Sequence, residues 1–82
     1  MSRVRIPPTL RAETAGAREV EASGRTVREL LDDLMGRFPA LRGQLDYANV
    51  YVGGEDIRTR DGYDTPVAES DTVILLPAMA GG

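Results

Sequence analysis

One segment of the chain carries a clear helical pattern, and the segments around it have the alternation of strands. The segment is TVRELLDDLMGRFP, residues 26–39. Thr26 and Glu29, three residues apart, form a capping box, which marks the start of a helix, and Pro39 prevents its continuation. An apolar stripe at helical spacing lies between them and consists of Val27, Leu30, Leu31, Leu34 and Phe38. Because one helix covers one face of a sheet, the sequence predicts a small α+β domain.

Strands are predicted on both sides of this helix. Residues 2–6 alternate arginine with valine and isoleucine, and residues 17–22 are predicted to pair with them as a hairpin. After the helix, Val50 and Val52 point to one side and Tyr51 to the other. Gly53-Gly54 then supplies a tight turn, with Ile57 on the returning strand. A closing strand over residues 72–76 completes a mixed sheet in the order strand, strand, helix, strand, short strand, strand.

The closing strand, TVILL, is apolar on both faces. Alternation sends Val73 and Leu75 to one side of the sheet, and Ile74 and Leu76 to the other. Since one helix covers one side, we expect one pair on an exposed apolar surface beside an outward residue such as Tyr51. Such surfaces commonly bind partners. The alternative is that strand ends or loops cover the second pair, and the sequence leaves both open.

The composition removes most catalytic chemistries. The chain has no cysteine and no histidine, and all ten basic residues are arginine. Disulfides, thiolate zinc sites, histidine bases and lysine Schiff bases are therefore excluded. The formal charge of −3 argues against binding to a nucleic acid backbone. The N-terminus lacks an apolar signal segment, and no apolar run could span a bilayer. We expect a cytoplasmic protein that is not an enzyme, binds no cofactor or metal, and contacts neither nucleic acid nor membrane.

Two short motifs have structural explanations. Asp32 and Asp33 are adjacent on the predicted helix, so their carboxylates point about 100° apart and do not converge as an acid–base pair. Gly53-Gly54 lacks the helix N-terminus, lysine and hydroxyl of a phosphate-binding loop, which favours a hairpin turn.

Residues 77–82, PAMAGG, follow the closing strand and are predicted to form a flexible, extended tail beyond a domain of residues 1–76. The residues after Pro77 reach about 17 Å when extended, at about 3.3–3.6 Å per residue. Gly81 and Gly82 lack side chains, so this end can enter a tunnel that a Cβ would block. The Gly82 carboxylate is ionised at neutral pH and is the reactive group that stands clear of the predicted fold. The alternative is a frayed terminus without a role.

The chain resembles the ThiS/MoaD family of ubiquitin-like sulfur carrier proteins, and is closest to its CysO-type members of actinobacteria. The resemblance runs through VRIP, TVRELLDDL and NVYVGGEDIR, and is most specific in ESDTVILLPAMAGG. That last segment is similar to the family's closing strand, which is followed by small residues and Gly-Gly. Ser70, Gly53 and Met79 depart from residues that are usual in the family. The resemblance implies a β-grasp fold, with the helix packed across one face of the mixed sheet.

It also implies a function that resides in the tail. An E1-like enzyme would adenylate the Gly82 carboxylate with ATP, and a sulfur donor would displace AMP to leave a thiocarboxylate. A partner synthase would then take the sulfide, for cysteine, molybdopterin or a sulfur-containing natural product. Gly81 would give clearance in the enzyme's tunnel. The expected partner-binding residues are Ile74, Leu76, Pro77, Ala78, Met79 and Ala80.

Two other functions fit the same residues. The first is a ubiquitin-like modifier that is conjugated to lysines through Gly82. The second is a plain β-grasp interaction domain whose tail is inert.

Overall fold

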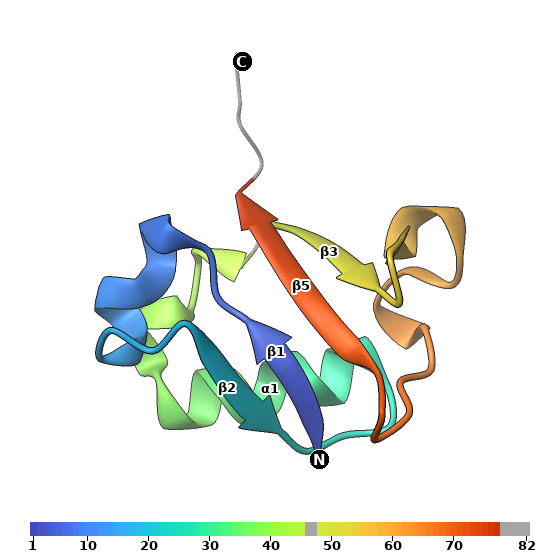
Figure 1. Ribbon diagram of the computed structural model, residues 1–82, viewed down its shortest axis with the longest axis horizontal. Helices are drawn as coiled ribbons and strands as arrows, with labels where there is room; N and C mark the ends of the chain where they lie inside the picture. The colour runs from blue at the N-terminus through green and yellow to red at the C-terminus, as the bar shows by residue number, and fades with distance from the viewer. Residues whose placement is uncertain (46–47, 78–82) are drawn as a thin grey trace.

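The computed structural model describes residues 1–45 and 48–77 of the chain (Figure 1). Five strands, one α-helix and several short 3₁₀ helices follow one another along it. In chain order they are β1 (Ser2–Arg5), η1 (Pro8–Thr14), β2 (Glu19–Ala22), α1 (Val27–Arg37), η2 (Pro39–Leu41), β3 (Ala48–Val52), β4 (Glu55–Asp56), η4 (Ile57–Thr59), η5 (Gly62–Asp64) and β5 (Thr72–Pro77).

The strands form one mixed sheet in the order β2-β1-β5-β3-β4. β1 and β5 are parallel, and the other neighbouring pairs are antiparallel. β5, the last strand in the chain, therefore lies in the middle of the sheet, and α1 crosses behind the strands in Figure 1. The predicted order of elements and the mixed sheet are confirmed.

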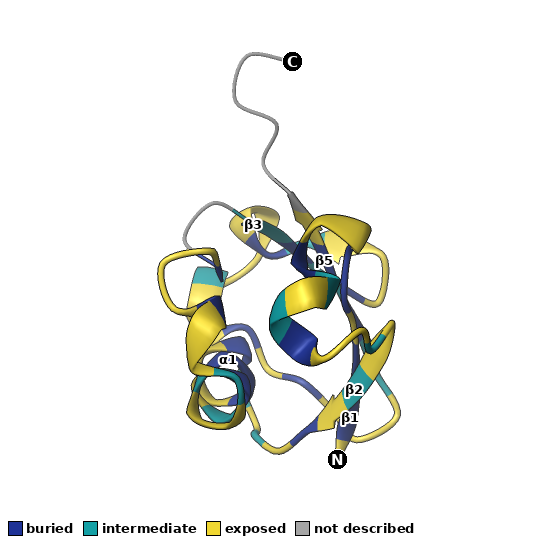
Figure 2. Ribbon diagram, turned by 90° about the vertical axis from the view of Figure 1, so that its left-hand side faces the viewer, coloured by how far each residue is buried: buried dark blue, intermediate teal, exposed yellow. Residues whose placement is uncertain are grey.

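The core fills the layer between α1 and the sheet, where the buried residues of the two elements face one another (Figure 2). Val27, Leu30, Leu31 and Leu34 of the predicted helix stripe are buried, and Phe38 is partly buried against the core. Val50 and Val52 of β3 meet them from the sheet, while Tyr51 points to the other side and is half-buried.

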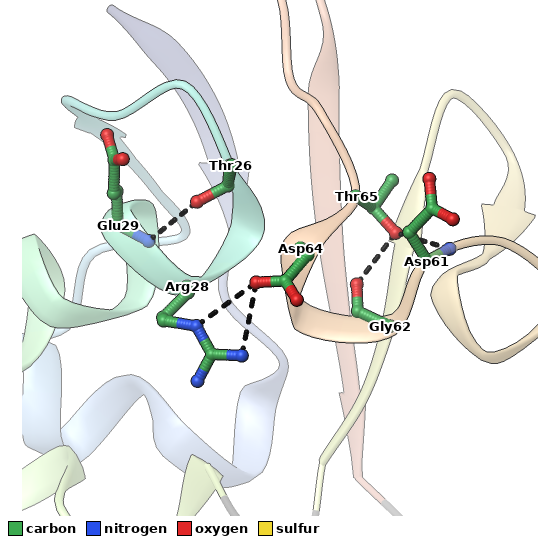
Figure 3. Close-up of polar contacts among 7 residues, drawn as sticks. All are labelled: Thr26, Arg28, Glu29, Asp61, Gly62, Asp64 and Thr65. Carbon is green, nitrogen blue, oxygen red and sulfur yellow. Dashed lines mark hydrogen bonds and ion pairs between the residues drawn. The ribbon is translucent and has the colours of Figure 1, made fainter.

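The start of α1 carries the predicted cap, with one difference. The Thr26 hydroxyl accepts a hydrogen bond from the Glu29 amide at 3.3 Å (Figure 3). The Glu29 carboxylate, however, accepts from the amide of Arg25 at 3.0 Å, one residue before the predicted donor. Thr26 and Pro66 form an isolated antiparallel bridge, in which the Val27 amide donates to the Thr65 carbonyl and the Val67 amide to the Arg25 carbonyl, so the loop before β5 lies against the start of the helix.

The loop before β5 is held to α1 and folded on itself by short polar contacts (Figure 3). Arg28 donates to Asp64 Oδ1 at 3.2 and 3.3 Å. The buried Thr65 hydroxyl donates to the Gly62 carbonyl at 2.7 Å and accepts from the Asp61 amide at 3.2 Å. These contacts fix the direction from which the chain enters the central strand.

Two segments differ from the prediction. Residues 8–14, between the two strands of the predicted hairpin, form the 3₁₀ helix η1 where the sequence predicted no helix, because Pro8 suits a helix start and Leu10 and Thr14 are buried against the domain. The placement of Ile57 on the returning strand was wrong. β4 ends at Asp56, whose carboxylate accepts from the Arg58 amide and starts η4, and Ile57 turns into the core.

Strand lengths also differ. β1 and β2 are shorter than the predicted strands over 2–6 and 17–22, and their hairpin is confirmed by pairing from Ser2–Ala22 to Arg5–Glu19. β5 continues through Pro77, which pairs with Ala48 and which the sequence assigned to the tail. Proline has no amide hydrogen, and the last position of a strand tolerates that loss.

Candidate functional site

The two faces of β5 are buried to very different extents. Val73 and Leu75 are 0% and 1% exposed, whereas Leu76 is 44% exposed and Ile74 is half-buried. The outward pair is therefore Ile74 and Leu76. The alternative that loops or strand ends cover Leu76 is wrong, since it is among the few large apolar side chains that the described chain exposes.

An apolar surface continues from β5 onto the neighbouring strand. Tyr51 on β3 lies directly opposite Ile74, and Asn49 lies opposite Leu76. Side chains at directly paired positions share one face of a sheet and contact each other. We call the surface formed by Tyr51, Ile74 and Leu76 the outer patch. It has the position next to Tyr51 that the sequence predicted.

A tight ion pair lies at the β4 side of the outer patch. Asp56, which pairs with Tyr51 across the ladder, accepts from Arg58 Nη2 at 2.6 Å and from Arg58 Nε at 3.1 and 3.2 Å. The side-chain hydrogen bond from Arg58, followed by its backbone hydrogen bond, lowers the pKa of the Asp56 carboxyl. The same contact raises the pKa of the Arg58 guanidinium, so both groups stay charged through the neutral range.

On the β1 side, two arginines, Arg5 and Arg11, lie near the outer patch. Arg5 pairs with Ile74 in the parallel ladder and is exposed, and Arg11 lines a surface hollow together with Arg5 and Leu76. Sequence patterns do not distinguish Arg5 from the other arginines of the chain. Only the register of β1 against β5 brings Arg5 beside the outer patch, so no local sequence signal could have identified Arg5.

The end of the patch is the point where the tail begins. β5 has a strand on each side, and Pro77 is paired to Ala48 by the β3 ladder. The root of the tail is therefore anchored to the centre of the sheet, one residue after Leu76. The remaining predicted site residues, which are Ala78, Met79, Ala80, Gly81 and Gly82, lie outside the described residues.

The described part of the chain offers little chemistry of its own. Within residues 1–45 and 48–77 there is no cluster of three or more side chains that could hold a metal ion. Over the same ranges, no helix is long and apolar enough to cross a membrane. Asp33 accepts from the Ser23 amide and pairs with Arg37, while Asp32 is exposed, so the two do not act together. Gly53 and Gly54 have φ values of 58° and 85°, as the predicted hairpin turn requires.

Comparison with known proteins points to one family. The ThiS family model matches residues 4–82. The sulfur carrier protein CysO of Mycobacterium tuberculosis is 38% identical over 89 residues, and the match covers 96% of each chain. In the crystal structure of the Amycolatopsis orientalis BexX/CysO complex, a chain that is 39% identical superposes with a TM-score of 0.91, with 100% of both chains covered. The solution structure of small archaeal modifier protein 1 from Methanosarcina acetivorans matches with a TM-score of 0.88 at 27% identity, over 99% of this chain and 95% of that one.

Proposed function

The chain belongs to the ThiS family, and we propose that it is a sulfur carrier protein, which takes up sulfur on its Gly82 carboxylate and delivers it to a partner enzyme. The observations that carry this proposal are the match of residues 4–82 to the ThiS family and the 38% identity to a sulfur carrier protein over 96% of the chain. The geometry supports it, because the central strand exposes Leu76 and anchors Pro77 immediately before the glycine tail.

The chemistry begins with activation of the carboxylate. A carboxylate is a poor electrophile, so an E1-like enzyme would transfer AMP to it from ATP and release pyrophosphate. Hydrosulfide, free or supplied by a sulfurtransferase, would then attack the acyl carbon, and AMP would leave with the electrons of the broken bond. The product is a thiocarboxylate on Gly82. In this scheme ATP is consumed by the enzyme and is not a cofactor of the carrier.

Delivery of the sulfur needs a second partner. The thiocarboxylate sulfur is a nucleophile at neutral pH and would attack an activated substrate held by a synthase, and the activating group would leave with the electrons of the broken bond. Hydrolysis or cleavage of the resulting acyl group would return the Gly82 carboxylate. A related CysO chain is found in a complex with BexX, which supports a carrier that works through protein partners. This chain would contribute position and clearance, with Gly81 and Gly82 entering a tunnel and the catalysts located in the partners.

The outer patch is where these partners would dock. An enzyme that acts on the tail must lie against the surface from which the tail starts, and the surface there is apolar and exposed. Burial of Leu76 and of the exposed part of Ile74 would contribute binding energy at about 25 cal/mol per Å² of apolar area. Because both enzymes must reach the same carboxylate, they would use this surface in turn.

Intact mass spectrometry tests the carrier function. The full chain is incubated with the E1-like enzyme from the same genome, ATP and a sulfide source. We expect a mass increase equal to replacement of one oxygen by sulfur, and its loss in a chain that lacks Gly82. A chain with Met79→Val, which keeps both glycines, is the matched control and should be converted. An unchanged mass for the intact chain would contradict the proposal.

A second function is favoured by one structural neighbour. Small archaeal modifier protein 1 shares the fold at 27% identity, and a modifier would use the same adenylated tail to form isopeptide bonds with lysines. The two functions separate in cells, where a modifier produces high-mass conjugates that contain the tail linked to lysine. A carrier produces the free thiocarboxylate without such conjugates.

A further inference from the structure

A groove opens beside the outer patch where β1 and β5 part. β1 ends at Arg5, and Pro7 and Pro8 lead the chain away from the sheet into η1. β5 continues to Pro77 without a neighbour on that side, because its pairing with β1 stops at Ile74. The space between them has a volume of about 280 Å³ and reaches Leu76. We call it the arginine groove, for the two residues described below.

The groove is apolar inside and already formed. Ile6 and Leu75, which are 2% and 1% exposed, line it together with the two prolines and the side of Leu76. Its walls are held by hydrogen bonds from Arg11 Nε to the Ile6 carbonyl at 3.1 Å and from the Leu10 amide to the Pro7 carbonyl at 2.9 Å. A site held in this way requires little ordering when a ligand enters.

Its charge differs from that of three other hollows of the described surface. The two ionisable residues that line it are Arg5 and Arg11, and among the described residues no carboxylate lines it. The other three are each lined by at least one aspartate or glutamate. The arginine groove is therefore locally positive in a chain whose formal charge is −3.

The Arg5 guanidinium is available for a partner. Glu19 lies opposite Arg5 in the β1–β2 ladder, but its carboxylate pairs with Arg3 at 3.6 Å. Among the described residues, Arg5 makes no ion pair or side-chain hydrogen bond. Arg11 uses Nε for the Ile6 carbonyl, which leaves its terminal nitrogens for another acceptor.

We propose that the arginine groove is the anchor site for the activating enzyme, and that it receives an apolar side chain adjacent to an aspartate or glutamate. The apolar side chain enters between Pro8 and Leu76, and the carboxylate bonds to Arg5 and Arg11 at the rim. This inference rests on the proposed function, since it names the chemistry by which an enzyme that acts on Gly82 would hold the root of the tail. Complementary charges at such a rim raise the association rate and fix the orientation of the complex.

Charge reversal tests the rim. Loading of Gly82 is followed by intact mass at increasing carrier concentration, for the wild type, Arg5→Glu and Arg60→Glu. Arg60 is an exposed arginine outside the groove, so the control makes the same change in net charge. We expect Arg5→Glu to raise KM for the carrier about tenfold or more with kcat little changed, and added salt to raise KM for the wild type much more than for this variant. An equal KM for the two variants would overturn the proposal, provided both unfold at the wild-type temperature.

Cross-linking identifies what enters the groove, without altering an arginine. The photoreactive residue p-benzoylphenylalanine replaces Pro8, which is exposed at the groove, and the irradiated mixture with the enzyme and ATP is analysed by peptide mass spectrometry. We expect an enzyme peptide in which an apolar residue neighbours an aspartate or glutamate. A cross-linked peptide without an acidic residue, or wild-type loading without any cross-link, would overturn the anchor site and leave the carrier function standing. Absence of loading in every chain, Arg60→Glu included, would instead refute the proposed function.

Discussion

The inner and outer faces of β5 carry the same kinds of side chain and have different roles. Val73 and Leu75 are at most 1% exposed beneath α1, whereas Leu76 is 44% exposed on the side of the sheet opposite α1. The chemistry of the side chains cannot explain this difference, because leucine occupies both faces. The position of the single helix decides which leucine stabilises the domain and which is left for a partner.

The surroundings of the two faces differ as well. The inner face meets other apolar side chains, such as Val4 and Leu34. The outer patch is bordered by charges, with Arg5 on one side and the Asp56–Arg58 pair on the other. An apolar centre with a polar rim is the usual anatomy of a protein interface. We therefore expect changes on the inner face to affect folding and changes on the outer face to affect loading.

The largest expected effect is on folding, from Leu75→Ala. Deleting this buried side chain removes apolar contacts and leaves a cavity, which costs about 2–5 kcal/mol of unfolding free energy. The matched variant is Leu76→Ala, on the next residue of the same strand, for which we expect a cost within about 1 kcal/mol. Urea unfolding followed by circular dichroism measures both. Equal costs would show that the outer leucine is part of the core.

The next effect is on loading, from Leu76→Asp. A carboxylate at position 76 would remove the apolar contact with the enzyme and would be desolvated in the complex, so we expect loading of Gly82 to fall about tenfold or more. The unfolding free energy should stay within about 1 kcal/mol of the wild type, as for Leu76→Ala, because the side chain is on the surface. Rates come from intact mass against time.

Thr72→Asp is the control for this variant. Thr72 lies on the same face of β5, at the end distant from the tail. Its variant introduces the same charge on the same strand and should load almost as the wild type does. Equal losses in the two variants would mean that charge on the sheet, and not occupation of the docking surface, blocks the enzyme.

The sequence was sufficient for the elements whose signals are local. The helix stripe, the cap at Thr26 and the glycine turn each depend on residues within a few positions of one another, and all three are present. Alternation also gave the correct pairs of β5 residues, although it could not tell which pair was inside. That choice depends on which side of the sheet α1 covers.

The features that the sequence missed depend on tertiary contacts. Ile57 leaves the strand because the Asp56 carboxylate caps a 3₁₀ turn and the core accepts the isoleucine. Arg5 borders the docking surface because β1 pairs in parallel with β5, a strand almost seventy residues later in the chain. Neither the competing cap nor the long-range register appears in a hydrophobic pattern.

A smaller effect on stability is expected from two side chains of α1 that bond to the backbone at the edge strand β2. Arg37 on α1 donates to the Glu21 carbonyl of the edge strand β2, while its ion-pair partner Asp33 accepts from the Ser23 amide at 2.9 Å. Arg37 and Asp33 therefore provide hydrogen-bond partners for the Glu21 carbonyl in β2 and for the Ser23 amide, one residue after the strand. We expect Arg37→Ala to cost about 1 kcal/mol of unfolding free energy, the net contribution of a typical hydrogen bond, because the side chain is partly exposed.

Arg28→Ala, on the same helix, is the matched comparison. Arg28 makes an exposed ion pair with Asp64 of η5, so its loss should cost about 0.5 kcal/mol or less. Hydrogen exchange at the Ser23 amide gives a local readout, since Arg37→Ala should accelerate it and Arg28→Ala should not. Equal stabilities and equal exchange would show that the Arg37 contact adds nothing to the edge.

The smallest expected effect is on the pH dependence of the melting temperature, which should involve a residue beside the outer face of β5 and none on its inner face. The inner face has no ionisable group, whereas Arg58 lowers the pKa of Asp56 below its ordinary value of 3.8. A carboxyl with a lowered pKa in the folded state stabilises the fold above its unfolded pKa, and this contribution is lost as pH falls through the folded value. The melting temperature should therefore fall below about pH 4 in the wild type, and less steeply in Asp56→Asn. Arg58→Gln should flatten the same region, and Arg60→Gln should retain the wild-type slope. If Asp56→Asn kept the full acid slope, the Asp56–Arg58 pair beside the outer patch would contribute nothing to the acid dependence of the melting temperature, and other carboxyl groups would have to account for it.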